Sequence, residues 1–129
     1  MKEILAYYYK ETERKYRWDG EYQGATFEVY IPKWRVPVPI PKKITVRIYT
    51  EPEFRNRIIL VSHAELLNNP SLAITPIAAK IAFTSECTET VRYDPEAEPN
   101  EAEIGSPYIP IALLDHPYPQ SLVITVDWN

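Results

Sequence analysis

The side chains of this sequence that could do metal or acid–base chemistry are few and far apart. The chain has two histidines, His63 and His116, and one cysteine, Cys87. No pair of them has the H-x-x-x-H or C-x-x-C spacing of a metal site, and residues 94–107 lack the D-x-D-x-D-G pattern of a calcium loop. We therefore predict no metal and no cofactor, and we interpret both histidines as ordinary surface residues.

Hydrolysis would need a nucleophile beside a base, or two carboxylates with separated pKa values. Ser62 directly precedes His63, and Glu11 and Glu13 share one face of a predicted strand. Neither pair comes with any sign of a cleft, and three glycines are too few for a glycine-rich phosphate loop. The sequence thus favours a non-catalytic protein, with no catalytic residue predicted. A small hydrolase-like enzyme is a further alternative.

Charge is divided unevenly along the chain. Residues 1–57 contain 12 of the 14 lysines and arginines with eight acidic residues, whereas residues 58–129 contain two basic and ten acidic residues. Aromatic side chains are interleaved with the basic ones between residues 30 and 57. On a small β-barrel, this combination would bind single-stranded nucleic acid through phosphate contacts and base stacking. The formal net charge of −4 opposes that alternative.

Our leading interpretation is an interaction or structural domain that contacts a partner protein or further copies of itself. Tyrosine, tryptophan and arginine dominate interface energies, and complementary charge favours association. The predicted interaction surface consists of Tyr30, Trp34, Arg35, Arg47 and Tyr49. Single-stranded nucleic-acid binding by residues 30–57 is the alternative.

The predicted fold follows from the positions of the prolines and of the β-forming runs between them. Thirteen prolines, against three glycines, separate short runs of β-branched and aromatic residues. Proline cannot donate to a sheet ladder, so it marks strand starts, edges and connections. The runs alternate with period two, as half-buried strands do. We predict an all-β fold, a small antiparallel sandwich or barrel of about eight strands with one short helix.

The first third of the chain is predicted to be a long hairpin. Residues 3–18 alternate between two faces, and Asp19-Gly20 follows at once. Asp-Gly between strands is a strong hairpin signal, because a type I′ turn needs positive φ at both central residues. The return strand is expected at residues 21–31. The charged stretch 10–17 is expected to project as a solvated ribbon or to bend at a bulge.

The middle of the chain combines a connector, two strands and the helix. Alternating prolines predict an extended connector at residues 32–41. Strands are expected at 44–48 and, as a buried apolar run, at 57–61. A capping box, Ser62 with Glu65, predicts a short helix from His63 to about Asn68.

The last third is predicted to contain further strands and a loop rich in carboxylates. The strands are expected at residues 78–84, 88–93, 108–114 and 122–128. Pro110 places the strand 108–114 at a sheet edge, where it could pair with another chain. Residues 94–107 contain five carboxylates and no basic residue, and we expect a mobile, solvated loop there.

Length and composition predict one domain spanning residues 1–129. A single cysteine excludes an internal disulfide, which makes the reducing cytoplasm the predicted compartment. The first residues do not resemble a signal peptide, and no apolar run approaches the ~20 residues of a membrane helix, so no membrane partner is expected. The abundance of charged residues and proline is thermophile-like.

Overall fold

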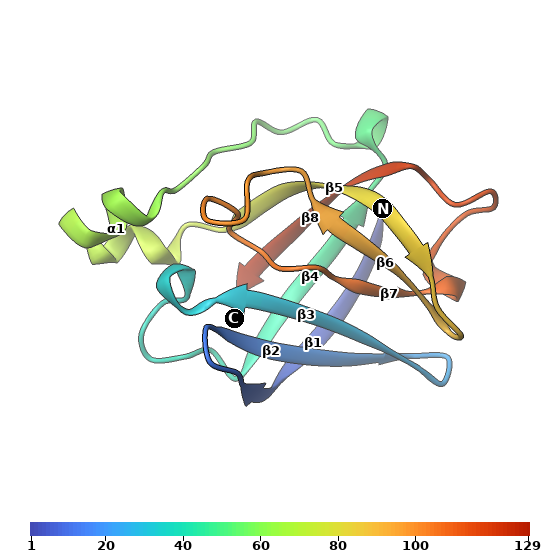
Figure 1. Cartoon of the computed structure of the whole chain (residues 1–129), viewed down its shortest axis with the longest axis horizontal. Helices are drawn as coiled ribbons and strands as arrows, with labels where there is room; N and C mark the ends of the chain where they lie inside the picture. Colours follow the sequence, from blue (N-terminus) through green and yellow to red (C-terminus); the bar gives the residue numbers. More distant parts are fainter.

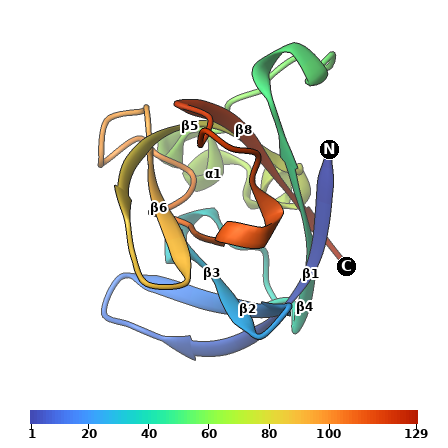
Figure 2. The same ribbon diagram turned by 90° about the vertical axis from the view of Figure 1, so that its right-hand side faces the viewer.

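The computed structural model describes all 129 residues. Its main feature is a closed barrel of eight antiparallel strands (Figure 1). The order around the barrel is β1-β2-β3-β7-β6-β5-β8-β4, and pairing of β4 with β1 closes it. Figure 2 shows the strands surrounding a common interior. The strands are β1 (Lys2–Glu11), β2 (Lys15–Tyr22), β3 (Ala25–Pro32), β4 (Lys43–Tyr49), β5 (Ile77–Glu86), β6 (Thr90–Pro95), β7 (Tyr108–Pro110) and β8 (Ser121–Trp128). The predicted all-β fold of about eight strands is confirmed, and it is a barrel.

Alternate residues of the strands fill the interior, where 21 buried side chains form one hydrophobic cluster. Phe27, Val29 and Ile31 enter from β3, while Ile44 and Val46 enter from β4. This is the period-two pattern that the sequence predicted for these strands. A small closed barrel is filled by such side chains, so the main core lies inside it.

The predicted turn at Asp19-Gly20 is wrong, because both residues lie within β2. The two-residue turn is Gln23-Gly24, whose φ angles of 50° and 83° are the positive values that a type I′ hairpin needs. A Cβ on Gly20 would lie only 2.5 Å from the carbonyl oxygen of Leu5 in β1. Glycine is therefore required at position 20 by a close backbone approach.

Residues 57–61 are not a strand. They belong to an extended segment, residues 54–62, which we call the strap; it crosses the outside of the barrel from η2 (Glu51–Glu53) to α1 (His63–Asn68) (Figure 1). Ile59 and Leu60 are exposed and Val61 is buried. Residues 55–61 make no backbone hydrogen bond within the protein. The prediction fails because the barrel is closed, which leaves no strand edge for an apolar run to join.

The predicted edge strand 108–114 is shorter and is not at an edge. β7 ends at Pro110, and η4 (Ile111–Leu113) follows. β7 pairs with β6 on one side and, through Glu28 and Tyr108, with β3 on the other. Closure of the barrel thus removes the edge that the sequence suggested for association with another sheet.

The short helix is confirmed at α1, with the predicted capping box. The Glu65 backbone N–H donates to Ser62 Oγ and the Ser62 backbone N–H donates to Glu65 Oε1, both at 3.1 Å. A second, small cluster packs Val61 of the strap against Leu66 of α1 and Ala73 of η3 (Pro70–Ile74). No helix in the structure has both the length and the apolar character needed to cross a membrane.

The connector 32–41 is not extended throughout. It begins with a short helical turn, η1 (Lys33–Arg35), and bends again at residues 38 and 39 before β4. Val38 is 93% exposed in this bend. The prediction of a continuous polyproline-like segment is therefore wrong.

Ionisation of Tyr93 on β6 is expected to destabilise the barrel at alkaline pH. Its ring is buried, its hydroxyl donates to the carbonyl of Pro119 at 2.8 Å, and burial raises its pKa to about 12. An unfolded tyrosine ionises near pH ~10, so this stabilisation is complete below pH ~10 and is lost as the pH rises towards 12. We expect the free energy of unfolding, measured with urea between pH 9 and 12, to fall over this interval. A Tyr93→Phe variant with an equally steep fall would contradict this assignment.

Candidate functional site

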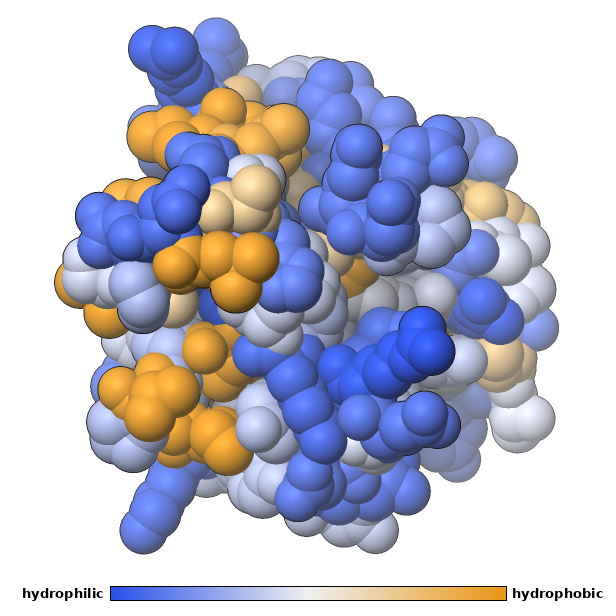
Figure 3. Space-filling view, turned by 60° about the vertical axis from the view of Figure 1, so that its left-hand side comes forward, coloured by the Kyte–Doolittle hydropathy of each residue, from blue (hydrophilic) through white to orange (hydrophobic).

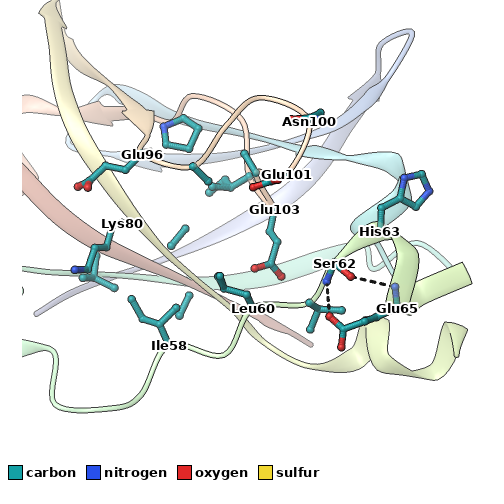
Figure 4. A pocket seen from close by; sticks show the side chains of 18 of the residues that line it. Ile58, Leu60, Ser62, His63, Glu65, Lys80, Glu96, Asn100, Glu101 and Glu103 are labelled. Carbon is teal, nitrogen blue, oxygen red and sulfur yellow. Dashed lines mark hydrogen bonds between the residues drawn. The ribbon is translucent and has the colours of Figure 1, made fainter. Parts of the chain in front are cut away.

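A groove of about 1000 Å³ lies on the outside of the barrel. Its floor includes Ala78 and Lys80 of β5 and Val123 of β8. The strap forms one wall, and residues 96–103, which we call the acidic loop, form the other (Figure 4). The first turn of α1 closes one end. The groove is thus built by three segments that are separate in the sequence.

The strap offers apolar side chains and free backbone groups to the groove. Ile58 and Leu60 line it from the strap side, facing the acidic loop (Figure 4). Leu60 is 70% exposed, although it is a large apolar residue. Because residues 55–61 make no backbone hydrogen bond within the protein, their N–H and C=O groups are free to pair with another extended chain.

Apolar exposure continues from the groove onto the α1 end of the molecule. Figure 3, which turns this end forward, shows apolar patches there between hydrophilic residues. The segment from the strap to η3 contains four large and strongly exposed apolar residues: Ile59, Leu60, Leu67 and Ile74. Apolar residues grouped in this way are typical of a protein contact surface.

The opposite wall is negatively charged. Glu96 and Glu101 project from the acidic loop (Figure 4), and neither carboxylate has an ion-pair partner. Lys80 is the one lysine or arginine that lines the groove, whereas five glutamates do so. A low-dielectric cleft lined by charge of one sign concentrates counter-charged ligands. This groove therefore favours a ligand that is both apolar and cationic.

A buried ion pair holds the acidic loop in place. Arg35 Nε donates to Glu103 at 2.6 Å, and its two terminal nitrogens donate to the carbonyls of Ala73 and Thr75 at 2.8 and 2.6 Å. The two charged side chains are 0% and 4% exposed. Arg35 thus joins η1, η3 and the acidic loop, and no buried side-chain polar atom is left without a partner.

Two predictions are corrected by this pair. Arg35 was expected on an interaction surface, but it is fully buried and cannot meet a partner. The loop 94–107 was expected to be solvated, yet Ala102, Glu103 and Ile104 are buried, with Ile104 in the main core. Only the first part of the loop is exposed. Sequence reasoning failed here because the two ionic partners are 68 residues apart.

The other predicted surface residues do not form one site. Tyr30 lies on β3. Tyr49 packs edge-on against Phe54, with ring centroids 5.2 Å apart. Arg47 on β4 donates to two carboxylates at 2.9 and 2.7 Å. The barrel separates β3 from β4 by two strands, so residues close in the sequence are spread around its circumference.

Trp34 contacts one of the residues that line the groove. Its ring stacks on His63, with centroids 5.1 Å apart and an interplanar angle of 18°. His63 lines the end of the groove, and Trp34 packs beside the small cluster beneath α1. Trp34 therefore helps to position this end of the groove by packing.

The residues considered for hydrolysis are engaged elsewhere. Ser62 accepts a hydrogen bond in the capping box and makes none with His63. Glu11 pairs with Lys33 at 2.6 Å. His63 is stacked on Trp34, so its ring is positioned by packing rather than by a catalytic partner. No group of three or more His, Cys, Asp or Glu side chains is placed to hold a metal ion.

Sequence reasoning missed Leu60, Glu96 and Glu101 as site residues. The apolar run and the acidic stretch were both visible, but their meeting across β5 had no local signal. Comparison with protein-family models, curated proteins and solved structures finds no match for this chain. The geometry and charge of the groove therefore indicate which ligand it binds.

Proposed function

We propose that this protein is a non-catalytic interaction domain that binds an extended segment of a partner protein in the groove. The observation that carries this proposal is the strap, in which seven residues, 55–61, have unpaired backbone groups beside an apolar floor. An extended peptide adds to such a segment through main-chain hydrogen bonds, and alternate side chains enter the adjoining pockets.

The side chains of the groove define the chemistry of that segment. Ile58, Leu60 and Ala78 favour apolar side chains in the bound segment. The unpaired carboxylates of Glu96 and Glu101 favour lysine or arginine in it. The partner is thus an apolar and basic peptide stretch.

Nucleic-acid binding by residues 30–57, the alternative, has less support. Arg35 is buried and Arg47 is occupied by two carboxylates, which removes two of its cations. A cytoplasmic location and a thermophile-like habitat stay predictions.

Selection of random nine-residue peptides on the immobilised full-length protein tests this function. We expect enrichment of peptides that combine apolar residues with lysine or arginine. Leu60→Asp and the double variant Glu96→Lys/Glu101→Lys should each weaken binding of a selected peptide at least about tenfold, which is about 1.4 kcal/mol. Fluorescence anisotropy of the labelled peptide measures the affinity. Thermal unfolding should be unchanged, because the altered side chains are exposed.

Matched controls lie outside the groove. Glu98→Lys changes the same loop, and Val38→Asp introduces the same charge at an apolar side chain that is 93% exposed; neither residue lines the groove. Both variants should bind the peptide like the wild type. Hydrogen exchange should show slower exchange of the amides of residues 55–61 when the peptide is bound. Absence of enrichment, or unchanged binding by Leu60→Asp, would overturn the proposal.

A further inference from the structure

A second surface lies across the barrel from the acidic loop. β1 and β6 are separated by three strands in either direction, and the acidic loop follows β6. On the outside of β1, Leu5, Tyr7 and Tyr9 are 42%, 54% and 59% exposed. They are alternate residues of one strand and form a row that faces away from the core.

A bulge in β1 adds a cation to this row. The register with β2 shifts between Tyr8 and Lys10, so Tyr9 is the extra residue. Tyr8 meets the buried Trp18 edge-on, with ring centroids 5.9 Å apart, and is 37% exposed, less than Tyr9 at 59%. Lys10 is exposed beside Tyr9. Bulges redirect side chains in this way. Here the bulge brings the amine of Lys10 to the outer face beside Tyr9.

Cations surround the two exposed rings. The Arg17 guanidinium lies over Tyr9, 4.6 Å from the ring centroid, and Lys10 Nζ lies 5.9 Å from the same centroid. Lys43 of β4 is the cross-strand partner of Tyr7. We call these residues the tyrosine face: Leu5, Tyr7, Tyr9, Lys10, Arg17 and Lys43.

The unpaired charge on the tyrosine face is positive. Lys10 and Lys43 are exposed and form no ion pair. Among the nearby carboxylates, Asp19 shares Arg17 with Glu28, at 2.7 and 3.4 Å, and Glu3 shares an arginine of β4 with Asp127, at 2.9 and 2.7 Å, so each of them has a cationic partner. Salt screens the interaction between exposed charges beyond about 10 Å at 0.1 M. The negative charge of the acidic loop, on the opposite side of the barrel, therefore does not offset the positive charge of the tyrosine face.

We propose that the tyrosine face binds single-stranded nucleic acid, with bases stacked on Tyr7 and Tyr9 and phosphates held by Lys10 and Lys43. Exposed rings flanked by cations on a barrel surface are the combination that binds single strands without reading sequence. Unpaired lysines favour this ligand over a protein, since lysine is depleted at protein interfaces and is a common phosphate contact. This activity is independent of the groove.

A fluorescein-labelled 20-nucleotide oligo-dT, titrated with the full-length protein, tests this proposal by anisotropy. We expect saturable binding that weakens between 50 and 200 mM salt, with a slope of log K against log salt near −1.4 for two phosphate contacts. Tyr7→Ala/Tyr9→Ala should lower the affinity at least about tenfold and keep that slope. Lys10→Ala/Lys43→Ala should lower the affinity and bring the slope towards zero.

Two controls locate the binding. Lys80→Ala removes an exposed, unpaired lysine of β5, across the barrel, and Trp34→Ala removes an aromatic side chain of the basic stretch. Both should keep wild-type binding, with circular dichroism confirming the fold. The proposal is overturned if the oligonucleotide does not bind, or if Trp34→Ala rather than Tyr7→Ala/Tyr9→Ala abolishes binding. It is likewise overturned if the tyrosine variant changes only self-association in sedimentation, which would make the face a protein contact.

Discussion

Replacing Glu103 with leucine is expected to lower the free energy of unfolding by about 3–5 kcal/mol. The substitution leaves the guanidinium of Arg35 fully buried without its counter-ion. Such an uncompensated charge costs far more than the intact pair contributes. Urea denaturation at neutral pH measures the change, and Glu101→Leu on the exposed part of the same loop should stay within about 0.5 kcal/mol of the wild type.

The double variant Arg35→Met/Glu103→Leu separates charge burial from packing. With both charges removed, we expect part of the lost stability to return. The recovery should be incomplete, because the carbonyls of Ala73 and Thr75 lose their donor and each unsatisfied group costs about 1–3 kcal/mol. A Glu103→Leu variant as stable as the wild type would show that the pair does not secure the acidic loop.

Replacing Gly20 with alanine is expected to cost about 3 kcal/mol, at the upper end of typical overpacking penalties. The new Cβ would lie 2.5 Å from the Leu5 carbonyl oxygen and 3.1 Å from the Ile4 side chain. The obstacle is backbone, so β1 and β2 would have to separate. Thermal and urea unfolding of the purified variant measure the loss.

Gly24→Ala is the matched comparison for Gly20→Ala. At Gly24 a Cβ meets nothing within 4 Å, and the cost comes from its positive φ of 83° alone. A non-glycine residue in this conformation costs roughly 1–2 kcal/mol. If Gly24→Ala destabilised the protein more than Gly20→Ala, the close approach of β1 and β2 would not be the reason for the glycine in β2.

Local patterns were sufficient where the determinants of an element lie within a few residues. The alternation of residues 44–48 and of 122–128 predicted β4 and β8, since a strand needs only one apolar face directed at a core. The capping box of Ser62 and Glu65 predicted α1 from His63 to about Asn68, because both of its hydrogen bonds are made within one turn.

Local patterns misled where the partner is distant in the sequence. Asp19-Gly20 has the composition of a turn, but β1 passes so close that glycine is needed within a strand. The apolar run 57–61 has the composition of a buried strand, but closure of the barrel excludes it from the sheet. The same closure removes the expected edge at 108–114.

Local sequence patterns were enough to predict an all-β fold of about eight strands, one capped helix and an uneven distribution of charge. These follow from periodicity, proline and composition, which act over short stretches of chain. Long-range packing, by contrast, buries Arg35 against Glu103, sets the strap opposite the acidic loop, and places Tyr7 and Tyr9 beside unpaired lysines. Each of these contacts depends on strand order and register, which are set when the barrel closes and the whole core packs at once.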